Sequence, residues 1–242
     1  MRLPFHSQAA WLANFSERYV LSLLFLAFAW LEFKQGMLEW HILHFGGDHT
    51  DFTFLIQHVI MVLLNVSIGT GLLFGQTMTV APQSLEEIIV PLFATFFYLT
   101  YSSIDTLPPW LSENLAPPAW QVPLAGCGLV LGVLGRVIAA WGALYLGRSF
   151  GIFVSVREVV LRGPYHYVRH PIYLGYLLLF AGLALAYGCA ALILIVPTHF
   201  GLFVWRARLE EARLAAASPA YREYMLHTGA FFPKLRPQKK LR

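Results

Sequence analysis

Long apolar runs recur along this chain, and short polar segments separate them. A helix that crosses a bilayer needs about 20 predominantly apolar residues, and several of the runs reach or approach that length. Proline pairs such as Pro108 and Pro109 end runs, because proline removes a helix donor and its ring clashes with the preceding turn. The pattern predicts helical spans over residues 19–33, which residues 11–15 would extend, 52–74, 88–107, 121–146, 171–187 and 190–217.

These spans predict an all-α integral membrane protein with about six crossings, four helices followed by a C-terminal helical hairpin that turns at Gly188. Six crossings return both ends of the chain to one side of the membrane, whereas a five-span alternative would separate them. Residues 150–160 are too charged to span and rich in β-branched side chains, so we expect an interfacial loop there. We divide the chain into a variable part, 1–110, and a core, 111–242, within one structural unit.

Composition agrees with a membrane protein: 57% of the residues are hydrophobic, 12% are charged, and the mean hydropathy is +0.60. Soluble domains carry about 25% charged residues. Residues 151–242 hold 12 Lys and Arg against 4 Asp and Glu, while residues 1–150 hold 5 against 9. The positive-inside rule therefore places the loop 148–169 and the tail 206–242 in the cytoplasm. We expect the tail to contact lipid headgroups rather than nucleic acid.

Two further expectations concern the start of the chain and its cysteines. The first apolar run follows no short basic segment and no small-residue cleavage site, so we expect it to stay in the protein. Cys127 and Cys189 both fall inside predicted spans, where structural disulfides are unusual, so two free thiols are expected.

Polar chemistry is concentrated in residues 163–175, which place arginines, histidines and tyrosines between membrane-length apolar segments. Such groups are costly near hydrocarbon and need partners there, which marks a candidate site. On the last span, polar and aromatic residues recur at helical spacing and share one face. Adjacent Glu210 and Glu211 point about 100° apart and can reach different partners. The face consists of His199, Phe203, Arg206, Glu210 and Arg213.

An alternative interpretation makes this helix end a solvated surface held by ion pairs between neighbouring turns. The context favours a site, because closing the hairpin would bring the Glu pair to the depth of Arg169 and His170. Arg136 lies mid-span, where an unpaired charge is expensive. It either anchors an acceptor headgroup or locks helices together through an ion pair or carbonyl contacts.

The motifs resemble those of a known family, the isoprenylcysteine carboxyl methyltransferases and their phospholipid methyltransferase relatives. The resemblance covers roughly residues 125–235 and rests on Arg-His-Pro-x-Tyr-x-Gly at 169–175, the Glu pair, and a Tyr-x-x-Tyr at 221–224. This chain departs from relatives that have Phe-Gly before that last motif. Here Ser218 and Pro219 are typical of a helix N-cap and first position, although the segment could also reshape the acceptor entrance.

The resemblance implies a membrane methyltransferase that binds S-adenosylmethionine in a cytoplasmic pocket and receives an apolar acceptor from the bilayer. Glu oxygens suit the cofactor's ammonium and ribose, Arg suits a carboxylate, and Tyr suits the adenine. Transfer in a dry, aligned pocket does not demand a dedicated base. The implied catalytic residues are Arg169, Arg206 and Glu211; the implied cofactor-binding residues are Gly163, Pro164, Tyr165, His170, Pro171, Tyr173, Gly175, Glu210 and Glu211; the implied acceptor-binding residues are Arg136, Arg206, Tyr221 and Tyr224.

The sequence does not decide which chemical group accepts the methyl group. We favour a carboxylate such as that of an isoprenylcysteine, with a phospholipid amine or a small thiol as alternatives. An NADPH-dependent membrane reductase and a non-enzymatic membrane carrier are the competing functions. No metal site is expected, because the histidines lack a carboxylate or cysteine set to complete a coordination sphere; these are His41, His44, His49 and His58. Membrane lipids are the expected partners, and the sequence leaves the oligomeric state open.

Overall fold

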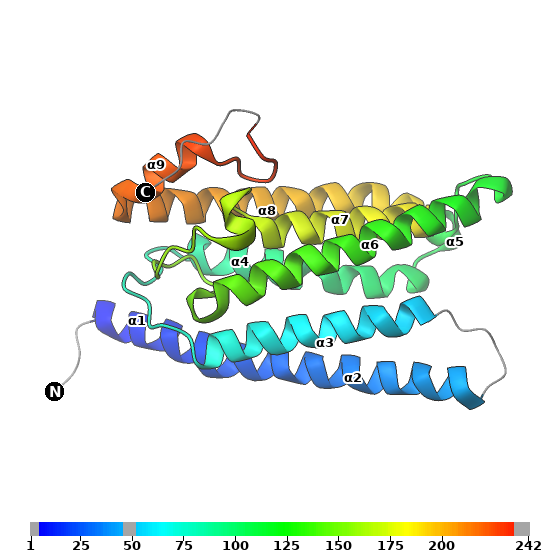
Figure 1. Cartoon of the computed structure of the whole chain (residues 1–242), viewed down its shortest axis with the longest axis horizontal. Helices are drawn as coiled ribbons and strands as arrows, with labels where there is room; N and C mark the ends of the chain where they lie inside the picture. Colours follow the sequence, from blue (N-terminus) through cyan, green and yellow to red (C-terminus); the bar gives the residue numbers. More distant parts are fainter. Residues whose placement is uncertain (1–4, 46–51, 235–242) are drawn as a thin grey trace.

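The computed structural model describes residues 5–45 and 52–234 as a helical bundle, and it places no β-strand in those residues. Long helices run side by side along one axis, and the first and last helices lie at the same end of the bundle (Figure 1). The main elements are α1 (Phe5–Phe15), a π-helical segment (Ser16–Leu21), α2 (Ser22–Phe45), α3 (Phe52–Leu73), α4 (Glu86–Phe96), a 3-10 helix (Phe97–Thr106), α5 (Pro109–Ser112), α6 (Pro118–Leu146), short 3-10 turns (Gly147–Ser149 and Gly163–His166), α7 (Pro171–Tyr187), α8 (Ala190–Ala217) and α9 (Pro219–His227).

Three helical stretches of the described residues are long and apolar enough to cross a bilayer: Ala10–Leu38, Pro118–Ser149 and Ala190–Ala217. Two shorter apolar helices, His58–Leu73 and Pro171–Tyr187, accompany them. These helices support an integral membrane protein, as the sequence predicted. The count of six crossings and the cytoplasmic orientation stay predictions, although α1 and α9 do lie at the same end of the bundle (Figure 1).

Two predicted spans differ in detail from the structure. The first is longer than residues 19–33, because the chain is helical from Phe5 to Phe45 with a π-helical segment inside it. The third was expected as one helix over 88–107, but α4 ends at Phe96, where φ is −100° and ψ is 0°. Beyond that residue the chain winds more tightly as a 3-10 helix to Thr106.

The β-rich piece at 150–160 forms a loop without a strand. Its main pairing is an isolated antiparallel bridge between Val80 and Val156. The Val156 N–H donates to the Val80 carbonyl at 3.0 Å, and the Thr79 N–H donates to the Val156 carbonyl at 2.9 Å. The β-branched residues therefore favour extended backbone, but the segment has too few partners to build a sheet.

Glycines allow α6 and α7 to touch backbone to backbone. A Cβ placed on Gly135 would overlap the carbonyl of Gly175, and one on Gly175 would overlap the carbonyl of Gly135. Such close approach is how helices pack in membranes, where small residues bring more atoms into contact. Helix α7 begins at Pro171, a residue suited to the first helical position, and ends at Gly188, whose φ of +58° favours glycine.

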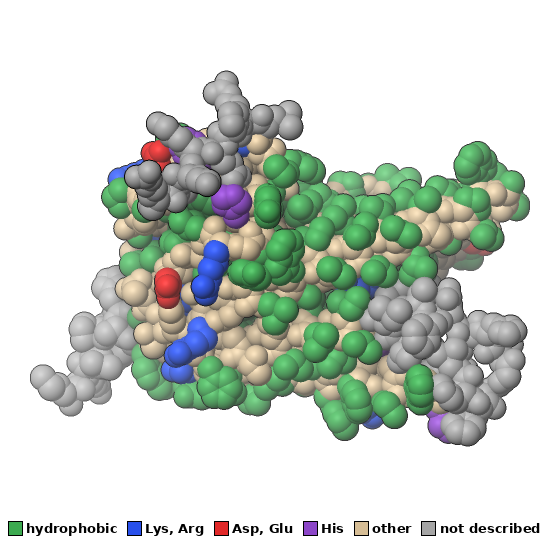
Figure 2. All heavy atoms as spheres, viewed as in Figure 1, with side chains coloured by type: hydrophobic (Ala, Val, Ile, Leu, Met, Phe, Trp, Pro, Cys, Tyr) green, Lys and Arg blue, Asp and Glu red, His purple; other side chains and the backbone are tan. Residues whose placement is uncertain are grey.

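The outer surface of the bundle fits a lipid environment. Hydrophobic side chains cover the long body, whereas most charged side chains on the visible face gather toward the end that carries α1 and α9 (Figure 2). Large apolar residues are exposed on several helices, which would be costly in water and is favourable in hydrocarbon. Examples are Leu23, Leu31, Leu63, Val130, Ile193 and Leu194.

The prediction of free thiols is confirmed for both cysteines. Cys127 is exposed on α6, and Cys189 is buried. Cys189 lies at the turn before α8 rather than inside a span, where it forms an isolated bridge with Asn114. The tail at 237–242 and the side chains of His44 and His49 lie outside the residues that the structure describes.

Candidate active site

The loop before α7 is shaped by a glycine turn and held by α9. Gly163 has a φ of +63°, and a Cβ there would collide with the ring of Tyr145. The turn buries Tyr165, whose hydroxyl donates to the Gly142 carbonyl at 3.3 Å. From α9, the hydroxyl of Tyr224 donates to the carbonyl of Tyr165. Two parts of the motif that are far apart in sequence therefore lock one turn in place.

The segment after α9 runs beside the Arg-His-Pro motif. The Arg169 N–H donates to the Gly229 carbonyl at 2.8 Å, and the His170 N–H donates to the Ala230 carbonyl at 3.0 Å. The Arg169 guanidinium also donates to the carbonyl of Thr228. Helix α9 itself starts as the sequence predicted, because the Ser218 hydroxyl accepts from the Tyr221 N–H at 3.2 Å.

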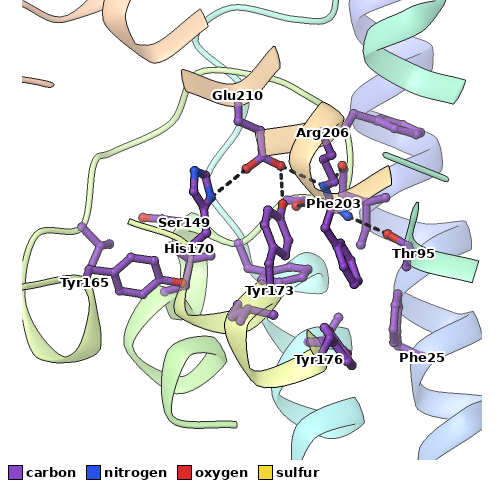
Figure 3. A pocket seen from close by; sticks show the side chains of 18 of the residues that line it. Phe25, Thr95, Ser149, Tyr165, His170, Tyr173, Tyr176, Phe203, Arg206 and Glu210 are labelled. Atoms are coloured by element: carbon purple, nitrogen blue, oxygen red, sulfur yellow. Dashed lines mark hydrogen bonds and ion pairs between the residues drawn. The ribbon is translucent and has the colours of Figure 1, made fainter. Parts of the chain in front are cut away.

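The two adjacent carboxylates on α8 bind different partners, as predicted. Glu211 accepts from Arg169 Nε at 2.7 Å and lies 2.8 Å from His170 Nε2. Glu210 accepts from the Tyr173 hydroxyl at 2.6 Å and from Arg206 Nε at 2.9 Å. Figure 3 shows Glu210 between the His170 ring on one side and Arg206 on the other. The hairpin thus closes with its basic and acidic groups at one depth.

Stacked rings form the wall beside these carboxylates. The His170 and Tyr173 rings lie 5.2 Å apart with an angle of 6° between their planes. Tyr173 also stacks on Phe203 at 5.1 Å, and the Arg206 guanidinium lies 5.1 Å from the Tyr173 ring centroid. Flat aromatic faces next to a carboxylate are suited to a planar base with a polar sugar attached.

Arg206 connects the site to other parts of the bundle. Only 4% of it is exposed, and its guanidinium reaches three elements besides its own helix. Nη1 donates to Thr95 Oγ1 at 2.7 Å, as Figure 3 shows, and Nη2 donates to the Ile152 carbonyl at 3.0 Å. Sequence reasoning missed Thr95, since a single threonine in an apolar run gives no signal of its own.

A buried ion pair holds the loop that supplies those carbonyls. Glu17 is 3% exposed, accepts from the N–H groups of Ile152 and Phe153 at 2.5 and 2.8 Å, and pairs with Arg157. It lies in the π-helical segment, a type of irregularity often found at functional sites. Glu17 also escaped the sequence analysis, because it precedes the predicted span 19–33, whereas Arg136 drew attention as a charge in the middle of a span.

A cavity of about 430 Å³ opens onto this cluster, within the range that small-molecule sites occupy. It continues between the helices along apolar side chains that include Phe25, Phe28 and Met61. Eight of the predicted site residues line it: Tyr165, Arg169, His170, Tyr173, Arg206, Glu210, Tyr221 and Tyr224.

The other predicted site residues lie outside the cavity lining. Glu211 stands behind Arg169 and His170, and Gly163 and Gly175 serve the turn and the helix crossing described above. Pro164 and Pro171 are buried parts of the backbone frame. Arg136 is on α6 with its Nε buried and without a hydrogen-bond partner, and it does not line the cavity.

The tyrosines at the cytoplasm-facing end of the predicted topology stay protonated. Burial raises the pKa of Tyr165 well above its usual value, and the Glu210 carboxylate adds to this rise. Burial likewise raises the pKa of Tyr221 and of Tyr224, with Glu211 contributing to both. These phenols therefore act as hydrogen-bond donors at neutral pH rather than as bases.

The residues present fit S-adenosylmethionine. Glu210 keeps 22% of its side chain exposed, and its Oε2 makes only a 3.8 Å contact with His170, so the carboxylate can still accept bonds from the cavity. Serines and tyrosines on the wall offer further hydroxyls, and the ring stack offers an apolar face. The described residues contain no group of three or more His, Cys, Asp or Glu that could hold a metal ion.

Comparison with known proteins agrees with this geometry. Residues 124–217 match the family described as phospholipid methyltransferase, which confirms the resemblance. The chain is 35% identical over 120 residues to the cobalt-zinc-cadmium resistance protein CzcN of Cupriavidus metallidurans, covering 48% of this chain and 52% of that protein. It is 32% identical over 111 residues to the nickel-cobalt-cadmium resistance protein NccN of Alcaligenes xylosoxydans xylosoxydans, covering 44% and 50%. The chain thus spans about half the length of the curated relatives it matches.

Proposed function

We propose that this protein transfers a methyl group from S-adenosylmethionine to an apolar acceptor that enters from the bilayer, because residues 124–217 match the phospholipid methyltransferase family. The proposal rests on one cavity whose wall is polar in one part and apolar in the rest. Charged and aromatic residues of the family motifs surround one part of it, and apolar residues of the membrane helices surround the rest.

The polar part offers partners for the ammonium or ribose hydroxyls of the cofactor and for its adenine. When bound, S-adenosylmethionine supplies a methyl group on a positively charged sulfur. Glu210 would accept from its ammonium or ribose hydroxyls, and the stacked rings of His170 and Tyr173 would lie against its adenine. Glu211 would act indirectly, since its bonds to Arg169 and His170 fix their orientation.

The apolar part would hold the acceptor and exclude water. Its wall includes Phe25, Phe28, Met61 and Phe180, so binding would be driven mainly by the burial of apolar surface. Catalysis would come from alignment of acceptor and donor in a dry site. An isoprenylcysteine-type carboxylate stays a prediction for the reacting group, as do a phospholipid amine and a small thiol. Metal resistance, named for the two relatives, is not part of the proposal.

The test is calorimetric titration of the full chain in lipid nanodiscs with S-adenosylhomocysteine, the demethylated product of the cofactor. We expect saturable binding that Glu210→Gln weakens about 10-fold or more, because the substitution removes a charge-assisted hydrogen bond. Glu223→Gln is the matched control, since Glu223 is an exposed residue of α9 that pairs with His227 outside the cavity.

The same titration with NADPH separates the competing functions. Binding of NADPH without binding of S-adenosylhomocysteine would favour a reductase. A folded protein that binds neither would contradict the methyltransferase proposal and favour a carrier. Unchanged affinity in Glu210→Gln would leave the enzyme class standing but remove Glu210 from the cofactor site.

A further inference from the structure

A polar side chain, Asn65, lies in the apolar part of the cavity wall, on a helix that precedes the family match. It belongs to α3, and only 7% of it is exposed. Met61, four residues before it, and Ile68, three residues after it, line the same cavity. Residues at this spacing share one face of a helix, so the face of α3 that includes Asn65 points into the cavity.

The carboxamide of Asn65 makes no hydrogen bond within the residues that the structure describes. The chain has two other asparagines, and both are engaged. Asn14 accepts from the Met78 N–H at 3.2 Å, and Asn114 accepts from the Ala116 N–H at 2.8 Å. Asn65 differs from them because its amide donors and its amide acceptor are not used by any described residue.

The amide atoms of Asn65 are open to the cavity rather than enclosed by protein. In the described residues, the side-chain atoms that are both unpaired and fully enclosed are Tyr101 Oη, Arg136 Nε and His199 Nδ1, and neither amide atom of Asn65 is among them. An unpaired carboxamide at membrane depth is costly, and buried polar groups normally have a partner. Since Asn65 lines the cavity, a group inside the cavity can reach its amide.

The packing of α2 against α3 indicates the depth of Asn65. The two helices run antiparallel, and Ser22 Oγ donates to the Gly69 carbonyl at 2.8 Å. Asn65 lies four residues before Gly69 and Phe25 lies three residues after Ser22, so both lie about 5–6 Å from that contact along the bundle. Figure 3 shows Phe25 on the same side of the pocket as Thr95, which binds the guanidinium of the polar part. Asn65 therefore lies near the border between the apolar and polar parts of the cavity.

The unpaired groups in this part of the wall are neutral, which bears on the charge of their partner. Tyr98 and Tyr176 also line the cavity, and their hydroxyls make no hydrogen bond within the described residues. The charged side chains of the wall are already engaged, so a charged group at this depth would lack a free counter-charge. A neutral group that both donates and accepts would use both ends of the Asn65 carboxamide. The engaged pairs are Glu32 with His58, Arg157 with Glu17, Arg169 with Glu211, Arg206 with Glu210, and Glu158 with Gln76.

We propose that the methyl acceptor carries, within its apolar body, a neutral group that both donates and accepts a hydrogen bond, such as a hydroxyl, and that Asn65 binds this group. The inference rests on the proposed methyltransferase function, and it concerns the body of the acceptor rather than the atom that is methylated. Asn65 is then a specificity residue that the helices before the family match supply. Its bond holds the acceptor at a fixed depth, so that the reacting end reaches the polar part. A plain hydrocarbon tail leaves the carboxamide unpaired and binds less tightly.

The test compares two variants and three probes. Asn65→Leu removes the carboxamide and keeps a similar volume. Thr70→Val is the matched control, since Thr70 lies on the same helix, donates to the Val66 carbonyl at 2.6 Å, and does not line the cavity. The probes share one tail: octanol carries a hydroxyl, fluorooctane replaces it by a group that cannot donate, and octanoate replaces it by a charge. All proteins are studied in identical nanodiscs, so the partition of each probe into lipid cancels when variants are compared.

The full chain is titrated by calorimetry, first with S-adenosylhomocysteine and then, in the loaded protein, with each probe. We expect the ratio of octanol affinity to fluorooctane affinity to fall about 5-fold in Asn65→Leu and to stay unchanged in Thr70→Val, because one hydrogen bond is lost. The affinity for octanoate should not depend on Asn65. Nuclear magnetic resonance of protein labelled with heavy nitrogen in its asparagines adds a direct measurement. Octanol should shift the amide signals of Asn65, fluorooctane should not, and the signals of Asn14 and Asn114 should stay in place.

The outcomes separate the inference from the proposed function. If the parent protein does not bind S-adenosylhomocysteine, the proposed function fails and the inference falls with it. If it does bind, any of four results overturns the inference alone. Octanol could leave the Asn65 signals in place, which would mean that only water meets the carboxamide. Asn65→Leu could weaken octanol and fluorooctane equally, which would make Asn65 structural. Octanoate could depend on Asn65 more than octanol does, or Asn65→Leu could weaken S-adenosylhomocysteine itself, which would assign Asn65 to the cofactor.

Discussion

The segment that matches a methyltransferase family and the helices before it contribute in different ways to one site. Residues 124–217 carry the charged motif residues that line the polar part of the cavity. The preceding helices carry no recognisable motif, yet they supply Thr95 and Glu17, which fix Arg206 and its loop. They also supply the Ala94 carbonyl that orients His199. The family match therefore covers charged residues that line the polar part of the cavity, but not the residues of the preceding helices that hold them in place.

The strongest test of this dependence is to remove the link between the two regions. Arg206→Gln deletes the ion pair with Glu210 and the bond to Thr95, and it leaves a partly buried carboxylate without its cation. We expect the free energy of unfolding to fall by about 3–5 kcal/mol, and the affinity for S-adenosylhomocysteine to fall about 100-fold. Thermal unfolding and calorimetric titration measure the two effects.

Arg208→Gln is the control for that substitution, because Arg208 is an exposed arginine of the same helix. A surface charge change of this kind should alter stability by less than about 0.5 kcal/mol. If Arg206→Gln proved equally mild, the two regions would not depend on Arg206, and the comparison drawn above would be wrong.

Glu17→Gln tests the contribution of the N-terminal helices without touching the matched segment. The Gln oxygen can still accept from Ile152 and Phe153, but Arg157 loses its counter-charge in a buried position. We expect a loss of about 2–3 kcal/mol in the free energy of unfolding. We also expect about 10-fold weaker binding of S-adenosylhomocysteine, because the loop that holds Arg206 is less well fixed.

A double substitution sharpens the same point. Glu17→Gln combined with Arg157→Gln removes both charges, so the stability cost should be smaller than the sum of the two single costs. Glu158→Gln serves as the control, because Glu158 belongs to the same loop and its carboxylate makes an exposed bond with Gln76. Additive costs would mean that Glu17 and Arg157 act independently and do not form a structural pair.

Gly175→Ala asks whether a motif residue binds the cofactor or only allows helices to pack. The added Cβ would meet the Gly135 carbonyl and Ala139, so α6 and α7 must separate. Overpacking of this kind costs about 1–3 kcal/mol. Gly126→Ala is the control, since a Cβ there meets nothing within 4 Å. Unchanged affinity of the folded Gly175→Ala protein for S-adenosylhomocysteine would assign Gly175 to packing, whereas a marked loss of affinity at normal stability would assign it to the site.

These contrasts also show how far the sequence could take the argument. Apolar run length and proline positions predicted the fourth span and the hairpin closely, because helix length and helix ends follow from local chemistry. The pairing of Glu210 and Glu211 with different partners followed from their angular separation on one helix. Glu17, Thr95 and the Ala94 carbonyl could not be predicted in their roles, because those roles depend on which helices pack together. The change of α4 into a 3-10 helix after Phe96 likewise gave no clear signal in the apolar pattern.

The smallest expected effect comes from Thr95→Val, which removes one of the bonds to Arg206 while keeping the shape of the side chain. Arg206 would retain Glu210 and the Ile152 carbonyl, so the loss should be about 1 kcal/mol, or about 5-fold in affinity for S-adenosylhomocysteine. Thr100→Val is the control, since its exposed hydroxyl bonds only to the Phe97 carbonyl of its own segment. If Thr95→Val matched this control, α4 would line the cavity with apolar side chains but would not hold Arg206 by a hydrogen bond. The N-terminal helices would then support the polar part of the site only through Glu17 and the loop that it binds.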